Sequence, residues 1–170
     1  MNTIDAKTYR DGMSLLPAAV TVVTTDGEAG KGGMTVSAIT SVTDTPATLL
    51  ICINQNSKMN EMLKTNARFV VNILQASNEE ISNRMAGFDG SEPSERFDLG
   101  EWKEGTLKQP ILKNASAAFE CEIVKTDEVG THSVIYGEVK ELHTFEKEES
   151  PLMYFNRSYQ QFRVDETVTP

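Results

Sequence analysis

The chain has 170 residues, of which 39% are hydrophobic and 24% charged, a balance that argues for a folded globular protein. Its formal net charge of −9 arises in residues 76–170, so a nucleic-acid-binding surface is not expected. Two cysteines are too few for a disulfide framework, and no segment resembles a membrane span or a signal peptide. We therefore expect one cytoplasmic domain, residues 1–170, that binds neither membrane nor nucleic acid.

The first half of the chain is predicted to contain two helices and four strands. Apolar residues at helical spacing predict the first helix, Pro17 ends it, and Asn56 or Ser57 caps the second. β-Branched runs predict the strands, and Gly30, Gly32 and Gly33 lie in a hairpin connection. In chain order, we expect a helix over 5–16, strands over 19–25 and 34–40, a loop at 43–46, a strand over 49–53, a helix over 57–64 and a strand over 69–74.

The second half is predicted to be mainly strands. A helix should start at Asn78, because Ser77 and Glu80 have capping-box spacing, and residues 87–108 have the composition of a loop. Strands are expected over 118–124, 131–142, 152–155 and 162–164, with a turn at 127–130. Strands outnumber helices, and the long pair at 117–142 has no crossover helix. We therefore expect antiparallel, barrel-like β structure; the segment 49–53, apolar throughout, should be buried on both faces.

Common catalytic motifs are missing from the sequence. The glycines between Gly27 and Gly33 fit neither a phosphate-binding loop nor a dinucleotide fingerprint, and they are interpreted as a hairpin. The histidines and cysteines have no zinc-ligand spacing, and there is no Gly-x-Ser-x-Gly motif. If the protein is an enzyme, a cofactor is expected to carry its chemistry.

Four features are typical of a ligand site. The segment 34–42 is rich in small polar side chains, against which a flat ring can lie close to the backbone. The segment 54–58 opens a helix, whose N-terminus suits a phosphate; Asn72 is an amide among apolar residues, and His132 begins a strand. Each has a structural alternative: sheet surface, helix caps, a satisfied core amide and a hydrogen-bonded surface histidine.

The order of these features resembles the short-chain flavin reductases of the FMN-binding split-barrel fold. The resemblance covers about residues 8–163 and is carried by the stretches 18–25, 35–38, 41–46, 52–57, 69–74, 130–132 and 152–155. Within the family, Pro46 and the stretches 54–60 and 85–87 are most similar to the reductase components of 4-hydroxyphenylacetate 3-monooxygenases.

The resemblance implies a fold, an activity and partners. The fold would be a mainly β, six-stranded antiparallel Greek-key split barrel with a few short peripheral helices, in a homodimer. The activity would be NAD(P)H:flavin oxidoreductase, in which NADH passes a hydride to FMN or FAD. The reduced flavin would then serve the oxygenase component of a two-component monooxygenase that hydroxylates 4-hydroxyphenylacetate or a related phenol. The choices between FMN and FAD and between NADH and NADPH stay open.

The resemblance also implies site residues. His132 would lie beside the nicotinamide as the catalytic residue. Many family members have Gly-Asp-His where this chain has Gly130-Thr131-His132, which leaves the orientation of the ring open. The cofactor-binding residues would be Thr35, Val36, Ser37 and Ala38 with Ser41 and Val42 at the flavin ring, Asn54, Ser57 and Lys58 at its phosphate, Asn72, and Pro151, Leu152, Met153 and Tyr154 at NADH.

Two other functions remain as alternatives. A flavin-binding carrier or sensor on the same barrel would bind flavin without reducing it. A plain β-barrel interaction domain would bind no flavin.

Overall fold

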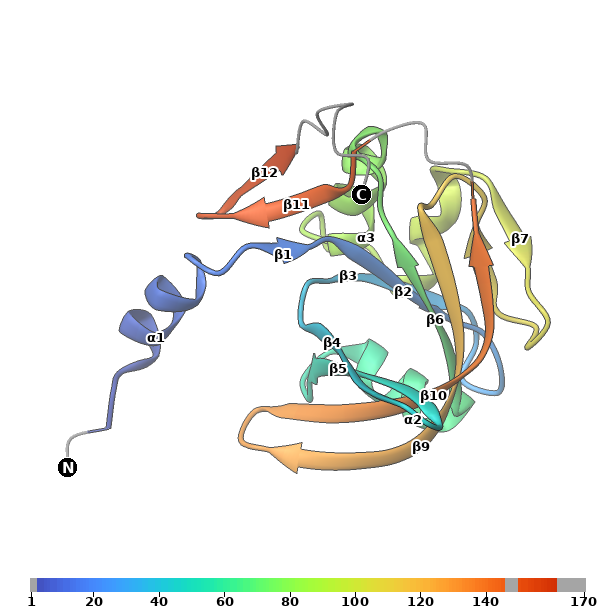
Figure 1. The fold of residues 1–170 in the computed structure, drawn as a ribbon, viewed down its shortest axis with the longest axis horizontal. Coiled ribbons are helices and arrows are strands. Elements are labelled where there is room, and N and C mark those ends of the chain that lie inside the picture. The colour runs from blue at the N-terminus through green and yellow to red at the C-terminus, as the bar shows by residue number, and fades with distance from the viewer. Residues whose placement is uncertain (1–2, 146–149, 162–170) are drawn as a thin grey trace.

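The computed structural model describes residues 3–145 and 150–161, which fold into a mainly β structure with a few short helices (Figure 1). The α-helices are α1 (Ala6–Met13), α2 (Lys58–Asn66) and α3 (Glu79–Ala86), and the 3-10 helices are Ala76–Asn78 and Pro93–Asp98. The strands are β1 (Ala18–Ala19), β2 (Thr21–Thr25), β3 (Gly32–Val36), β4 (Ile39–Asp44), β5 (Ala47–Asn54), β6 (Arg68–Ile73), β7 (Trp102–Glu104), β8 (Pro110–Leu112), β9 (Ala117–Val129), β10 (His132–Thr144), β11 (Leu152–Phe155) and β12 (Ser158–Gln161).

Seven strands form the main sheet, in the order β3-β2-β6-β9-β10-β5-β4, and neighbouring strands are antiparallel. β3 and β4 are its two edges, yet only Ser37 and Ala38 separate them in the chain. The sheet must therefore curve until its edges meet at this short link, as the ribbon shows (Figure 1). A smaller sheet, β1-β11-β12, and the pair β7-β8 complete the described strands.

The antiparallel, mainly β prediction is confirmed, but the count of six strands is wrong. The described residues contain twelve strands, and β3 and β4 do not pair to close the main sheet into a barrel. Two predicted strands are each divided. The segment 19–25 divides at Val20, whose N–H donates to Leu152 O and whose carbonyl accepts from Leu74 N. The segment 34–40 divides at Ser37 and Ala38, where the chain passes from one edge to the other.

The core lies inside the curve of the main sheet. Leu49, Ile51 and Ile53 of β5 point into it, and α2 covers it with Met59 and Leu63. The residues that alternate with them on β5 are only partly buried. The expectation that 49–53 is buried on both faces is therefore wrong, because this strand has one core face and one outer face.

The helix signals are largely confirmed, but α1 ends at Met13, four residues before Pro17, and not at Leu16 as predicted. Asp5 caps α1 by accepting from the N–H groups of Lys7 and Thr8, and Ser57 caps α2. α1 buries none of its residues and extends away from the sheets (Figure 1). α3 begins at Glu79, and the capping box before it pairs Gln75 with Asn78. The predicted capping box of Ser77 and Glu80 is therefore displaced by two residues.

The rest of the chain differs from prediction mainly in length. β9 and β10 each have 13 residues and are longer than expected, whereas the predicted strand 152–155 coincides with β11. Residues 87–108, expected to be a loop, include the 3-10 helix Pro93–Asp98 and β7. The strand expected at 162–164 lies outside the described residues. Within those residues, no helix has the length and apolar character required to cross a membrane.

Candidate functional site

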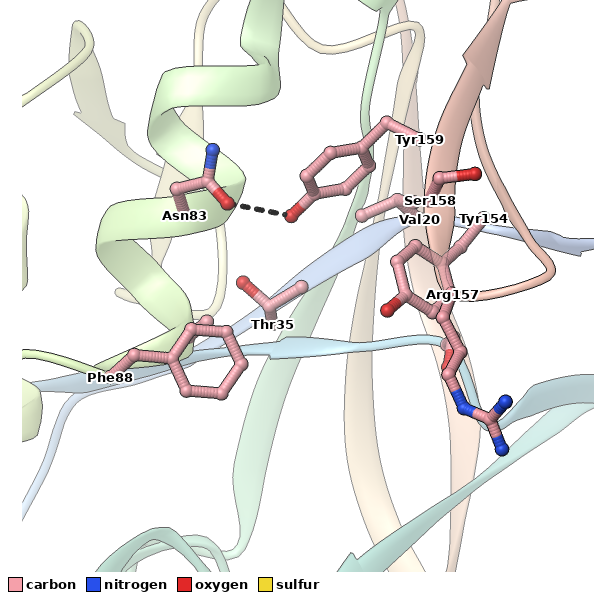
Figure 2. A pocket seen from close by; sticks show the side chains of 10 residues that line it. Val20, Thr35, Asn83, Phe88, Tyr154, Arg157, Ser158 and Tyr159 are labelled. Atoms are coloured by element: carbon pink, nitrogen blue, oxygen red, sulfur yellow. Dashed lines mark hydrogen bonds between the residues drawn. The ribbon is translucent and has the colours of Figure 1, made fainter. Parts of the chain in front are cut away.

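Two neighbouring cavities lie where the link between β3 and β4 meets the β11–β12 hairpin. The larger, about 830 Å³, has β4 and β5 on one side and the end of α1 with residues 14–19 on the other. The smaller, about 410 Å³, lies between α3, β3 and the hairpin (Figure 2). Ser37, Tyr154 and Arg157 line both, so the two cavities share a wall.

The β4–β5 side of the larger cavity is lined by small or apolar side chains, among them Ala38, Thr40, Leu50 and Cys52, and Arg10 and Arg157 line the cavity elsewhere. The carbonyls of Ser37 and Ala38 accept from Ile39 N and Cys52 N, whereas their N–H groups have no backbone acceptor among the described residues. Burial raises the pKa of the Cys52 thiol, so this group stays protonated at neutral pH. The surface offers hydrogen-bond donors beside a smooth wall, without a strong nucleophile.

The smaller cavity is polar and aromatic. Tyr154 and Tyr159 face each other across the hairpin, with ring centroids 5.6 Å apart in an edge-on arrangement. The Tyr159 hydroxyl donates to Asn83 Oδ1 at 3.1 Å, as Figure 2 shows, and lies 2.9 Å from Ser82 Oγ. Thr35 Oγ1 donates to the Ser82 carbonyl oxygen at 2.6 Å. These contacts fasten α3 to β3 and to the hairpin.

Four residues predicted for the flavin or NADH site come together at these cavities. Thr35 lines the smaller cavity, Ala38 lines the larger, and Ser37 and Tyr154 line both. Tyr154 reaches the site because β11 pairs with β1, directly before the main sheet. Residues from two distant stretches thus meet at one place, and their role in binding stays a prediction.

Three of the predicted ligand residues are buried in the protein interior, and their side chains line neither cavity. Val36 belongs to the main core cluster, and Leu152 is fully buried in a second cluster. Asn72 is fully buried; its Nδ2 donates to the Val22 carbonyl at 3.1 Å, and its Oδ1 accepts from Leu112 N at 2.9 Å. Its amide satisfies backbone groups of two other strands, which is the structural alternative.

Four more predicted residues lie near the cavities without lining either one. Ser41 and Val42 are exposed on β4, beyond Thr40. Pro151 forms an isolated bridge with Gln75, and Met153 lines a separate cavity of about 240 Å³. Met153 precedes Tyr154 on β11, so strand alternation turns its side chain to the face opposite that of Tyr154.

The three residues predicted for the phosphate lie together at the start of α2. Ser57 Oγ accepts from Met59 N at 3.3 Å, and Asn54 Oδ1 accepts from Asn56 N at 2.9 Å. Lys58 Nζ is 2.7 Å from Glu92 Oε2, in an exposed ion pair. Neither cavity is lined by these side chains, so their predicted role in phosphate binding stays a prediction.

His132 is exposed at the first position of β10, opposite Asn54 in the sheet. The next pair on this outer face is Val134 with Cys52, so His132 lies about 7 Å further along the sheet than the wall of the larger cavity. His132 Nδ1 is 2.9 Å from Thr131 Oγ1. The threonine hydroxyl is therefore the hydrogen-bond partner that can orient the ring.

Several cavity residues were missed by the sequence analysis. Asn83 and Phe88 come from α3 and the loop after it, Arg157 and Tyr159 from the β11–β12 hairpin, and Arg10 from α1. One signal for them is the pair Asn156-Arg157, which follows a short β pattern and is compatible with a tight turn. Both residues have positive φ, 48° and 62°.

Comparison with known proteins links this arrangement to one family. Residues 13–163 match the family described as "Flavin reductase like domain". The 4-hydroxyphenylacetate 3-monooxygenase reductase component of Pseudomonas aeruginosa is 41% identical over 151 residues, which cover 89% of this chain and 88% of that protein. The FMN reductase (NADH) RutF of Ancylobacter novellus is 46% identical over 156 residues, covering 92% of this chain and 84% of that protein. The structure of the Streptomyces globisporus NADH:FAD oxidoreductase SgcE6 matches with a TM-score of 0.85 at 28% identity, covering 97% of this chain and 99% of that one.

Proposed function

This chain belongs to the flavin reductase-like family, and from that membership we propose that it uses NADH to reduce FMN or FAD and releases the reduced flavin to a separate oxygenase. Flavin reduction with NADH is the activity that the names of its relatives state. Delivery to an oxygenase is supported by the relatives named as monooxygenase reductase components.

The observation that carries the proposal is the larger cavity beside Ser37 and Ala38. A flavin ring is flat and has several hydrogen-bond acceptors along one edge. The two unpaired N–H groups and the small side chains of this wall match both properties. A volume of about 830 Å³ is within the range of cofactor sites, which are roughly 300–1,000 Å³. The residues present therefore fit a bound flavin.

Bound flavin would supply the hydride acceptor, and the protein would hold the flavin and nicotinamide rings in position. Two rings held at reactive distance gain an advantage of roughly 7–11 kcal/mol over free encounter. Ser37 and Ala38 would fix one ring from the backbone side, and Tyr154 would limit its movement from the hairpin. His132, oriented by Thr131, would donate or accept a hydrogen bond at the nicotinamide; no residue has to exchange a proton during the transfer.

Oxidation of NADH with FMN, FAD and riboflavin supplied in turn tests the activity directly. We expect NADH-dependent loss of the visible flavin absorbance in a rapid-mixing experiment without oxygen. Flavin binding without that loss would indicate a carrier or sensor. If the purified protein is colourless and does not quench the fluorescence of added FMN, it does not bind flavin. That result would indicate an interaction domain and would contradict the proposal.

The oxygenase partner is proposed to hydroxylate 4-hydroxyphenylacetate or a related phenol, as the name of the 41% identical relative indicates for that protein. The test is reconstitution: this chain, NADH and flavin are mixed with a 4-hydroxyphenylacetate oxygenase component, and hydroxylated product is measured. Product formed no faster than with NADH and flavin alone would contradict this assignment.

We also propose a homodimer of single-domain chains in the cytoplasm, where NADH is available. α1 and the segment after it expose Tyr9, Met13, Leu15 and Leu16 by 45–62% each, and α1 buries no residue against its own chain. Such an apolar arm is suited to packing on a second copy.

A further inference from the structure

Phe88 is an aromatic side chain that the protein leaves almost wholly exposed. It is 91% exposed and lines the smaller cavity. It follows Gly87, whose positive φ of 65° ends α3. Exposure of a large aromatic ring at a cavity gives up the stabilisation of burial, which is explained if a ligand covers the ring.

The loop that carries Phe88 is held in place. The guanidinium of Arg96 donates to the Gly33 carbonyl at 3.1 Å, the Met85 carbonyl at 3.0 Å and the Ser91 carbonyl at 2.7 Å. A Cβ at Gly87 would lie 2.2 Å from this guanidinium, so the close approach requires glycine. The ring is therefore presented by a fastened loop.

Arg157 lies on the other side of the cavity, as Figure 2 shows. It occupies the tip of the β11–β12 turn with a positive φ of 62°, a conformation that is unfavourable for residues other than glycine. Two contacts with the arm hold the turn: Asn156 N donates to Ser14 O at 2.7 Å, and Arg157 pairs with Asp11. Only Nη2 of the guanidinium is used in that pair, so other N–H donors can bind an anion.

Asn83 of α3 also lines the cavity, where it pairs with Tyr159 (Figure 2). Asn83 Oδ1 accepts from Tyr159, which leaves the Asn83 Nδ2 group as a donor with no acceptor among the described residues. The cavity therefore combines an aromatic platform, an amide donor and a guanidinium. An adenine ring joined through ribose to phosphate has the matching parts, and about 410 Å³ suits one such unit.

We propose that the smaller cavity binds an adenine nucleotide, with the adenine stacked on Phe88 and the phosphate at Arg157. The inference rests on the proposed function, because the shared wall would let a dinucleotide place its reactive ring in the larger cavity and its adenylate half here. NADH and FAD both contain that half, so the chemistry of the site is the same for either source.

Calorimetric titration of the FMN-loaded protein with ADP tests the site without turnover. We expect Phe88→Ala to weaken ADP binding by about tenfold and Phe88→Trp to retain it. Leu99→Ala, at an apolar residue that is 38% exposed and lines neither cavity, is the control and should change nothing. Equal ADP affinity in Phe88→Ala and the unaltered protein would overturn the proposal.

The phosphate contact has its own matched pair of variants. Arg157→Gln should weaken ADP binding by about tenfold but leave adenosine binding unchanged. Asp11→Asn breaks the same ion pair while keeping the guanidinium, and it should bind ADP at least as tightly as the unaltered protein. If Asp11→Asn is as weak as Arg157→Gln, the arginine has only a structural role and the phosphate assignment fails.

Two further comparisons identify the source of the adenylate. If it belongs to NADH, Phe88→Ala raises the KM for NADH about tenfold with FMN as acceptor but leaves the KM for reduced nicotinamide mononucleotide unchanged. If it belongs to FAD, the variant weakens FAD binding but neither FMN binding nor the KM for NADH. If Phe88→Ala weakens FMN binding as much as FAD binding, and raises the KM for reduced nicotinamide mononucleotide as much as the KM for NADH, both assignments of the adenylate are contradicted. If the unaltered protein has no NADH:flavin activity, the proposed function is refuted. The ADP affinity would still test the adenine nucleotide site separately.

Discussion

Two residues that were both predicted to lie in the site, Asn72 and His132, have different surroundings in the structure. Asn72 and His132 were predicted on similar grounds, as polar residues in apolar or strand surroundings. Asn72 is buried with its amide paired to two backbone groups, whereas His132 is exposed and held by Thr131. A sequence shows that an amide lies in a strand, but not which carbonyl of another strand it meets.

His132→Ala is expected to lower kcat/KM for NADH by about tenfold, the effect of losing one good contact. Thr131→Val keeps the ring but removes its partner, so a smaller loss is expected. Steady-state kinetics with saturating flavin measure both. Unchanged kinetics in His132→Ala would remove this residue from the site.

Asn72→Ala is expected to lower the free energy of unfolding by about 1–3 kcal/mol, because it leaves the Leu112 N–H without its buried acceptor. Urea unfolding measures the loss. Flavin affinity of the folded variant should not change. A large loss of flavin affinity with unaltered stability would instead support the cofactor-binding prediction.

The Cys121 thiol makes stability depend on alkaline pH. Burial, with the neighbouring Glu120 carboxylate, raises its pKa from 9.0 to about 12. Between these values the unfolded chain loses the proton and the folded chain keeps it, so stability falls as pH rises from 9 towards 12. The loss due to this thiol should be about 1.4 kcal/mol at pH 10. Urea unfolding at pH 8 and pH 10 measures it, and Cys121→Ala should lack this component.

At the scale of elements, local patterns predicted most strands and helix starts, whereas strand breaks depended on distant partners. β11 and the Ser57 cap of α2 follow from a few neighbouring residues. The division at Val20 depends on Leu74 and Leu152, which lie more than fifty residues away in the chain. No local propensity contains that information.

Glu120 joins three elements and should be costly to remove. The fully buried carboxylate of this β9 residue accepts from Thr106 N at 2.9 Å and Leu107 N at 2.7 Å, and lies 2.7 Å from His143 Nε2 of β10. Glu120→Ala leaves both amides unpaired, and we expect a loss of about 2–4 kcal/mol in urea unfolding. Glu120→Gln keeps one acceptor oxygen and should lose less. Equal stability of the Ala variant would show that these bonds contribute little.

At the scale of the whole molecule, the two cavities lie where segments from the N-terminal and C-terminal parts of the chain pack beside the main sheet. The cavities combine α1, the β3–β4 link, α3 and the β11–β12 hairpin. The family resemblance located the link and Tyr154. It did not locate Phe88 or Arg157, because their position depends on how the hairpin and the loop after α3 pack.

The apolar arm provides the test of self-association. The unaltered chain should sediment with twice the mass of one chain, and Leu16→Glu, which charges a side chain that is 60% exposed, should weaken the dimer by at least tenfold. Sedimentation over a range of concentrations measures both. A monomer at all concentrations in the unaltered protein would contradict the homodimer proposal.

Ser37 and Ala38 connect the two edges of the main sheet, so the length of this connection determines how far apart β3 and β4 lie. The Ala38 carbonyl accepts from Cys52 N of β5, so a residue inserted before Ala38 would lengthen the connection by roughly 3.5 Å and leave that bond and the strand ladders in place. Bulkier synthetic dyes could then enter while the melting temperature is kept. Redesign of ligand choice could thus be confined to the two-residue segment that joins the edges of the main sheet.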